Sequence, residues 1–373
     1  MDSVAHTIPI LQDQVDSLKA LAIVPSIGWI PANHFPHLTH LYIAFDVSVE
    51  SPRPQDVLFL LRNAPRLEIL HIHRLNDPET ILNPESWQLE LSVRAELPRL
   101  RSLVFTVSAY HLVAHVLRGL SLPPSTLIRL DNLFVFYDSE YPGPIPAGLG
   151  ALDHITTMEL AVQNEMLFLV VESASSGLWL KVRHEKNTFW HRWLLDLHHT
   201  LPLTNLVSLR MDVSRYDPGL PVILRHMVQL SELFVRLNNG EDGPGDHAAT
   251  LPPGRSSSRS WPENMPKSAN LGISDIIAML STRSRLGHPI RRLIVQAITI
   301  GLESIRLASQ GFSEQLSSLA EHVEEYEECV DAETHVCGFE MRDMWNVEGA
   351  EDYWSVDDKQ RPRYTPLWSY EYS

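Results

Sequence analysis

Residues 64–74 read APRLEILHIHR, and this stretch carries the pattern that decides the fold. Apolar side chains occupy a first position, Leu67, and the positions three and five residues later, Leu70 and Ile72. Alternate residues of a strand point to opposite faces of a sheet, so Leu70 and Ile72 share one face and His71 lies on the other. The stretch therefore predicts a short strand with one buried face.

The same spacing recurs along the chain, nine times in all. The sets are Leu18, Leu21 and Ile23; Leu38, Leu41 and Ile43; Leu67, Leu70 and Ile72; Leu100, Leu103 and Phe105; Leu130, Leu133 and Val135; Ile155, Met158 and Leu160; Leu206, Leu209 and Met211; Leu230, Leu233 and Val235; Ile290, Leu293 and Val295. Several follow similar lead-ins, FPHLTHL, APRLEIL and LPRLRSL, in which a proline ends the preceding helix. A single unit cannot bury its own apolar face, so neighbouring units must stack.

Segments between these strands have helical apolar spacing, at 52–65, 109–120, 187–202, 217–230 and 274–289. The alternation resembles the leucine-rich repeat, whose pattern is LxxLxLxx(N/C). The resemblance implies an α/β fold: an irregular leucine-rich-repeat solenoid, or horseshoe, with short parallel strands on the concave face and helices on the convex face. We expect one further irregular unit between Ile155 and Leu206, because MLFLVVE and LWLKV are strand-like.

The pattern divides the chain into four parts. We assign residues 1–237 to the solenoid and 238–270, rich in Gly, Pro and Ser, to a disordered insertion. Residues 271–330 form the last repeat and a C-terminal capping helix, which the apolar spacing in GFSEQLSSLAEHVEEYEECV predicts. Residues 331–373 form an acidic tail rich in Trp and Tyr. This tail either folds back as a cap or binds a partner, and the sequence leaves both alternatives open.

Charge and motifs narrow the function. The net charge of −16 argues against nucleic acid and anionic membrane as partners. No targeting segment or membrane span is recognisable, so we expect a cytoplasmic or nuclear protein. Signatures of nucleotide-binding, hydrolase, metalloprotease and kinase sites are missing, so no enzyme activity, cofactor or metal is expected. His71 and His73 could form half of a metal site, but no third ligand accompanies them, and packed or solvated histidines are favoured.

The predicted strands also present side chains on the face opposite the leucines. Aromatic and arginine side chains there are the residue types that anchor protein partners. We therefore expect a partner-binding surface, unless loops or the tail cover it. Its candidate residues are Tyr42, His71, His73, Phe134, Phe136, Arg210, Phe234 and Arg236.

The lead-ins PHLTHLYI, PRLEILHI and PRLRSLVF, the irregular repeat lengths and the acidic aromatic C-terminus resemble the leucine-rich-repeat part of fungal F-box proteins. In that family an N-terminal F-box docks on the Skp1-type adaptor of a cullin ubiquitin ligase, and the repeats hold the substrate. The likeness covers residues 10–300. MDSVAHTIPILQDQVD has no room for an F-box, so we expect either a fragment of a longer protein or a repeat-only relative.

Two functions follow as hypotheses. The first is a non-catalytic protein-binding solenoid that recognises a protein or peptide, extended by the resemblance to substrate recognition in a ubiquitin ligase. The alternative is a structural scaffold or decoy that acts through its loop and acidic tail without recruiting a ligase. An enzyme built on His71 and His73 ranks third.

Overall fold

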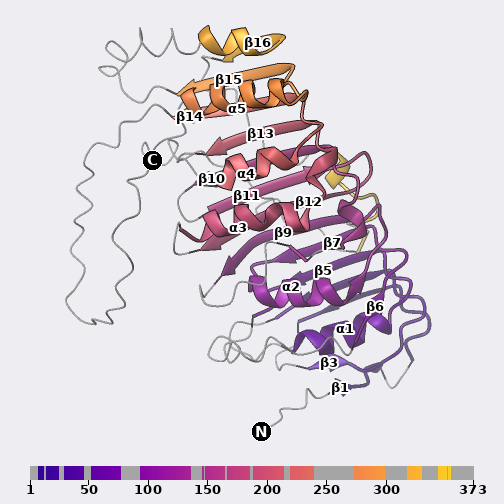
Figure 1. Ribbon diagram of the computed structural model, residues 1–373. Coiled ribbons are helices and arrows are strands. Elements are labelled where there is room, and N and C mark those ends of the chain that lie inside the picture. Colours follow the sequence, from indigo (N-terminus) through magenta and orange to yellow (C-terminus); the bar gives the residue numbers. More distant parts are fainter. Residues whose placement is uncertain are drawn as a thin grey trace, which may run out of the picture. The chain divides into compact units, whose positions relative to one another are not determined.

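The computed structural model shows a mixed α/β protein with a large, mostly parallel sheet of twelve strands (Figure 1). The chain divides into two compact units, which are described separately. The first comprises Met1–Arg210, Pro218–Leu230 and Cys337–Ser373, and the second comprises Met211–Asp217 and Ser231–Val336. The structure describes residues 7–11, 14–24, 29–45, 52–76, 93–135, 145–146, 148–163, 166–184, 188–213, 219–238, 273–298, 317–329, 343–350 and 352–353.

Parallel strands at successive copies of the sequence pattern form the first part of unit 1. They are β2 (Ala20–Ile23), β4 (His40–Ala44), β5 (Ile69–His73), β7 (Ser102–Thr106) and β9 (Leu127–Val135). Leu21, Leu41, Leu70 and Leu103 are successive register partners, which confirms the predicted alignment of the first four copies. From β4 onward the aligned leucines are fully buried. Helices α1 (Pro54–Arg62) and α2 (Tyr110–Gly119) pack beside these strands, as predicted (Figure 1).

A ladder of backbone hydrogen bonds fixes this register. The carbonyl of the residue after the first leucine accepts the N–H groups of two consecutive residues in the next copy. Lys19 O accepts from Thr39 N (2.8 Å) and His40 N (3.0 Å), and Thr39 O accepts from Glu68 N (2.8 Å) and Ile69 N (3.0 Å). Glu68 O receives Arg101 N and Ser102 N in the same way. The ladder therefore brings equivalent residues of neighbouring copies side by side.

The fifth copy differs from the prediction. Leu103 and Phe105 pair with Ile128 and Leu130, so the core-facing residues of β9 begin earlier than the predicted set of Leu130, Leu133 and Val135. The reason is that the position aligned with Leu100 is Ser125, so this copy lacks its first leucine, and only the later set has apolar residues at all three positions. Asn132, with φ 53, interrupts the alternation, and Leu133 is again fully buried.

Three further strands depart from the expected parallel arrangement. Strands β10 (Thr157–Gln163), β11 (Met166–Glu172) and β12 (Gly177–His184) pair antiparallel with one another, and β12 then lies parallel to β9. Only Ser173–Ser176 joins β11 to β12, which is too short for a parallel crossover. The strands predicted within 155–206 exist, and so does the helix after them, α3 (Thr188–Thr200). It packs on α4 (Gly219–His226).

Unit 2 repeats the ladder. Strand β13 (Ser208–Val213) crosses the boundary, and β14 (Glu232–Asn238), β15 (Arg292–Ile298) and β16 (Glu325–Cys329) run parallel to one another beside helix α5 (Ile273–Arg285). Ser231 O accepts Arg291 N and Arg292 N, and Arg291 O accepts Glu324 N and Glu325 N. The capping helix expected through Cys329 is therefore wrong at its end. Helical turns stop at His322, because the free edge of β15 binds the following residues as a strand.

Short elements complete the described chain. Strand β1 (Thr7–Ile8) pairs with β3 (Ile30–Pro31), and β6 (Ala95–Glu96) pairs with β8 (Leu120–Ser121). Single 3-10 turns are η3 (Gly150–Leu152), η4 (Leu203–Asn205), η5 (Ala320–His322) and η6 (Asp343–Trp345). The insertion assigned to 238–270 lies outside the described residues except for Asn238.

Candidate functional site

A pocket in unit 1 lies where the parallel strands begin. Its volume is about 520 Å³. Two rows of equivalent positions form it: the residues just before and just after the first leucine of each copy. The first row supplies Ser17, His37, Arg66 and Arg99, and the second supplies Lys19, Thr39 and Glu68. Because the ladder fixes the backbone of the second row, the pocket is a direct product of stacking the copies in register.

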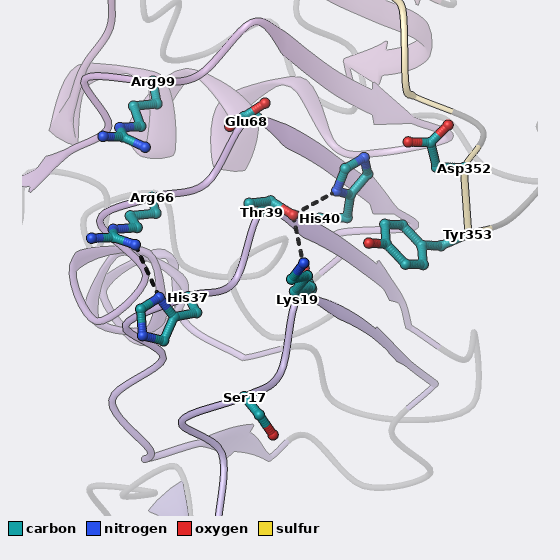
Figure 2. Close-up of a pocket in the computed structure, with 10 residues that line it drawn as sticks. All are labelled: Ser17, Lys19, His37, Thr39, His40, Arg66, Glu68, Arg99, Asp352 and Tyr353. Atoms are coloured by element: carbon teal, nitrogen blue, oxygen red, sulfur yellow. Dashed lines mark hydrogen bonds between the residues drawn. The ribbon is translucent and has the colours of Figure 1, made fainter.

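The C-terminal part of the chain completes the pocket. His40, the first residue of β4, lines it together with Asp352 and Tyr353 (Figure 2). His40 Nδ1 lies 2.9 Å from the hydroxyl of Thr39, and the two rings of His40 and Tyr353 meet edge to face with centroids 4.8 Å apart. Residues more than 300 positions apart in the sequence thus share one wall.

Positive charge dominates the rest of the lining. Arg66 donates from a guanidinium nitrogen to His37 Nδ1 at 2.9 Å, as Figure 2 shows. Within the described parts of the chain, no carboxylate forms a salt bridge with Lys19, Arg66 or Arg99. Three cations stand against two lining carboxylates, those of Glu68 and Asp352. The pocket can therefore accept a carboxylate or another anion, with arginine forks suited to bidentate binding.

The sequence-predicted candidates of β4 and β5 lie on the strand face opposite the leucines. The rings of Tyr42 and His71 meet edge to face at 5.0 Å. His71 Nε2 and His73 Nδ1 both approach the hydroxyl of Thr106, at 3.1 and 2.8 Å. Burial, followed by the charges of Arg129 and His73, lowers the pKa of His71 to about 3. Burial likewise lowers the pKa of His73 and raises that of Tyr42. His71 is thus a neutral, enclosed group.

Phe134 and Arg210 are the other unit 1 candidates. Phe134 is half-buried on β9, where its backbone N–H donates to Ser108 O at 3.1 Å. Arg210 forms an ion pair with Glu159, their nitrogen and oxygen 3.5 Å apart, and the Glu159 side chain is only 8% exposed. Phe136 lies outside the described residues. Arg210 therefore neutralises a buried acid of its own chain.

Two candidates belong to unit 2. Arg236 is 4% exposed, and its guanidinium lies 3.0 Å from the carboxylate of Asp212. The guanidinium of Arg292 lies 6.0 Å from the ring centroid of half-buried Phe234. Removing one partner of a buried ion pair strongly destabilises a folded protein, so Arg236 contributes to the stability of the fold.

Sequence reasoning missed the pocket because it followed the residues within the strands and not those that precede them. The signal was present in the lead-ins PHLTHL, PRLEIL and PRLRSL, whose variable residues flank the first leucine. Stacking these three lead-ins in register places His37, Arg66 and Arg99 in one row. The pattern within the strands alone does not indicate a site at the residues that precede them.

The residues that the structure describes hold neither a metal cluster nor a membrane-spanning helix. They contain no group of three or more His, Cys, Asp or Glu side chains arranged to hold a metal ion. No helix in the same residues is both long and apolar enough to cross a membrane. Comparisons with protein-family models, with curated proteins and with solved structures found no match to this chain.

Proposed function

We propose that this chain is a non-catalytic protein-binding protein, built as an irregular leucine-rich-repeat solenoid. The single observation that carries the proposal is the pocket at the start of the unit 1 strands. Side chains from successive copies stand in rows there, and the exposed cations Lys19, Arg66 and Arg99 form no salt bridge within the described chain. Rows of this kind suit extended protein segments, since their spacing is set by the strands.

The location of the pocket also supports binding. Lys19, Arg66 and Arg99 are exposed and lie outside the strands, so they can contact a partner without disturbing the core. Arg210, Arg236 and His71, by contrast, are engaged by their own chain. We therefore place the proposed contact at the pocket and not at the strand centres, and its lining includes neither Tyr42 nor Phe134.

Charge reversal tests the proposal. The double substitution Arg66→Glu with Arg99→Glu reverses two positive charges of the pocket lining. The matched control is Arg94→Glu with Arg225→Glu, because both control residues are exposed and lie outside the pocket lining. Proteins captured by the wild-type chain in its native extract are compared by quantitative mass spectrometry. A specific partner should be lost with the first pair and retained with the second. Equal recovery with both pairs, at unchanged thermal stability, contradicts a role for the pocket.

The resemblance to F-box proteins extends the proposal to substrate recognition in a ubiquitin ligase. If this extension holds, the Skp1-type adaptor and a cullin should accompany the natural gene product in immunoprecipitates, and the partner should lose ubiquitin when the gene is deleted. Recovery of the partner without adaptor or cullin favours the scaffold or decoy alternative.

A further inference from the structure

A short C-terminal segment lies along the same edge as the pocket. We call residues 343–350 and 352–353 the strap. At one end, the indole Nε1–H of Trp345 donates to Glu172 Oε1 at 2.9 Å, at the end of β11. The ring of Trp345 also covers Gly177, the first residue of β12, where an added Cβ would lie 3.3 Å from it. Glu172 and Gly177 are register partners, so the indole rests on one point of the sheet.

The strap then crosses to the strands of the pocket. A guanidinium nitrogen of Arg101, just before β7, donates to Glu348 O at 3.1 Å. His40 Nε2–H donates to Gly349 O at 2.8 Å, and the ring of Tyr353 packs against the same imidazole. The strap therefore binds at β11 and β12, before β7, and at β4. Ile69, Ser102 and Leu127, the register partners between these contacts, are all buried.

The contacts show what kind of chain this edge binds. Two of these three hydrogen bonds reach backbone carbonyls, those of Glu348 and Gly349. Both carbonyls lie in a turn that Ala350 N closes by donating to Val347 O at 3.0 Å, with Gly349 at φ 84. These contacts therefore select a glycine-containing turn and no particular side chain. Selectivity comes from Trp345 and Tyr353, which supply rings, and from acidic groups. Residues 343–353 contain four acidic and no basic residues. Asp352 faces the pocket that holds Lys19, Arg66 and Arg99 (Figure 2).

We propose that the strap occupies a binding site for acidic, aromatic peptide segments of a partner protein, and that such a segment binds this edge by displacing the strap. This inference rests on the proposed protein-binding function and names the chemistry of its partner. Charge complementarity with the pocket and the observed seat of an acidic aromatic segment both support this occupant. Because the strap is part of the same chain, it competes with a free ligand at an effective concentration on the order of millimolar. Weak ligands therefore fail to displace the strap, whereas tighter ligands displace it.

Binding of a labelled peptide with the sequence of residues 343–353, DMWNVEGAEDY, tests the inference by fluorescence anisotropy on the full chain. Trp345→Ala with Tyr353→Ala releases the strap. The released variant should bind the peptide at least about tenfold more tightly than the wild type, because the internal competitor is gone. A peptide with Asn and Gln in place of its acids, and one with Ala in place of its aromatics, should each bind at least about tenfold more weakly.

Two further variants in the released background localise the site. Arg66→Glu with Arg99→Glu should remove binding, whereas Arg94→Glu with Arg225→Glu should leave it unchanged. If the double release variant fails to fold by circular dichroism, Tyr353→Ala alone replaces it, because that side chain is 50% exposed. Equal affinity of wild type and released chain, or equal binding of the neutral peptide, overturns the inference.

The outcomes separate this inference from the proposed function. If charge reversal removes a cellular partner but release of the strap does not change peptide affinity, the proposed function is supported. The proposal that the strap competes with the partner is then contradicted. If the peptide binds as expected but charge reversal removes no partner from extracts, the binding site for acidic, aromatic segments is supported and the proposed protein-binding function is contradicted.

Discussion

His71 should make the stability of unit 1 depend on pH. Its side chain is 4% exposed, and burial together with Arg129 and His73 lowers its pKa from 6.5 to about 3. In the unfolded chain the imidazole regains its ordinary pKa near 6.5. Below that pH the unfolded chain binds a proton that the folded chain refuses, so the free energy of unfolding decreases. The contribution is complete above about pH 6.5 and is lost progressively towards pH 3.

The size of the effect follows from the same two pKa values. At pH 5 the unfolded chain has titrated through about 1.5 pH units that the folded chain has not. At about 1.4 kcal/mol per unit, this corresponds to a loss of about 2 kcal/mol relative to pH 7.5. Arg129, 9% exposed, and the half-buried His73 lie on β9 and β5 of the same sheet, and their charges add to the cost of a charge on His71.

Urea unfolding at pH 7.5 and pH 5.0, followed by tryptophan fluorescence, measures this loss. The His71→Gln variant removes the titrating group and keeps an amide that can reach the hydroxyl of Thr106. It should lose about 2 kcal/mol less than the wild type between the two pH values. His34→Gln, at an exposed position, is the control and should behave as the wild type. Equal pH dependence of His71→Gln and wild type would refute the reasoning. Amide hydrogen exchange over 69–76 and 102–108 should show the same loss locally.

Three substitutions test the packing. Leu103→Ala removes a fully buried leucine and should cost about 2–5 kcal/mol in urea unfolding, and a cost below 1 kcal/mol would contradict its place in the core. Asp212→Asn should cost about 3–5 kcal/mol, since it leaves the buried guanidinium of Arg236 without its carboxylate, and insensitivity would contradict the ion pair. Gly177→Ala places a Cβ 2.6 Å from Val171 O and should lower the melting temperature, whereas an unchanged melting temperature would contradict that close contact.

The fold was most predictable where each copy offers one register. Leu41 and Leu70 sit in short strands bounded by prolines and polar residues, so only one alignment buries them. At β9 the copy that stacks in register has Ser125 in place of its first leucine, so the spacing selected Leu130, Leu133 and Val135 and missed Ile128. The antiparallel strands β10 to β12 defeated the prediction for another reason. The repeat pattern describes which residues of a strand are buried, but it does not specify the direction of the neighbouring strand.

The candidate site was less predictable than the fold because the residues that form it come from distant parts of the chain. Alternation placed His71 on the face opposite the leucines, but nothing local announces that Thr106 and Tyr42 would enclose it. From the sequence, the acidic tail could be either a cap on the repeats or a partner-binding segment. In the structure, Trp345 and Tyr353 of this tail lie on the sheet of unit 1. Contacts over that separation follow from the three-dimensional arrangement and not from sequence spacing.

The division between strand centres and strand starts explains where recognition can change without loss of the fold. At the strand centres the face opposite the leucines also carries buried groups, such as Trp179 and Arg129. A substitution there alters burial, hydrogen bonding or an ion pair, and its cost falls on folding. At the strand starts the ladder does not use the side chains of Arg66 and Arg99, so these can be exchanged for other residues while the register persists. The binding specificity that we propose for the pocket can therefore vary most freely at exposed residues such as Arg66 and Arg99, which lie outside the core.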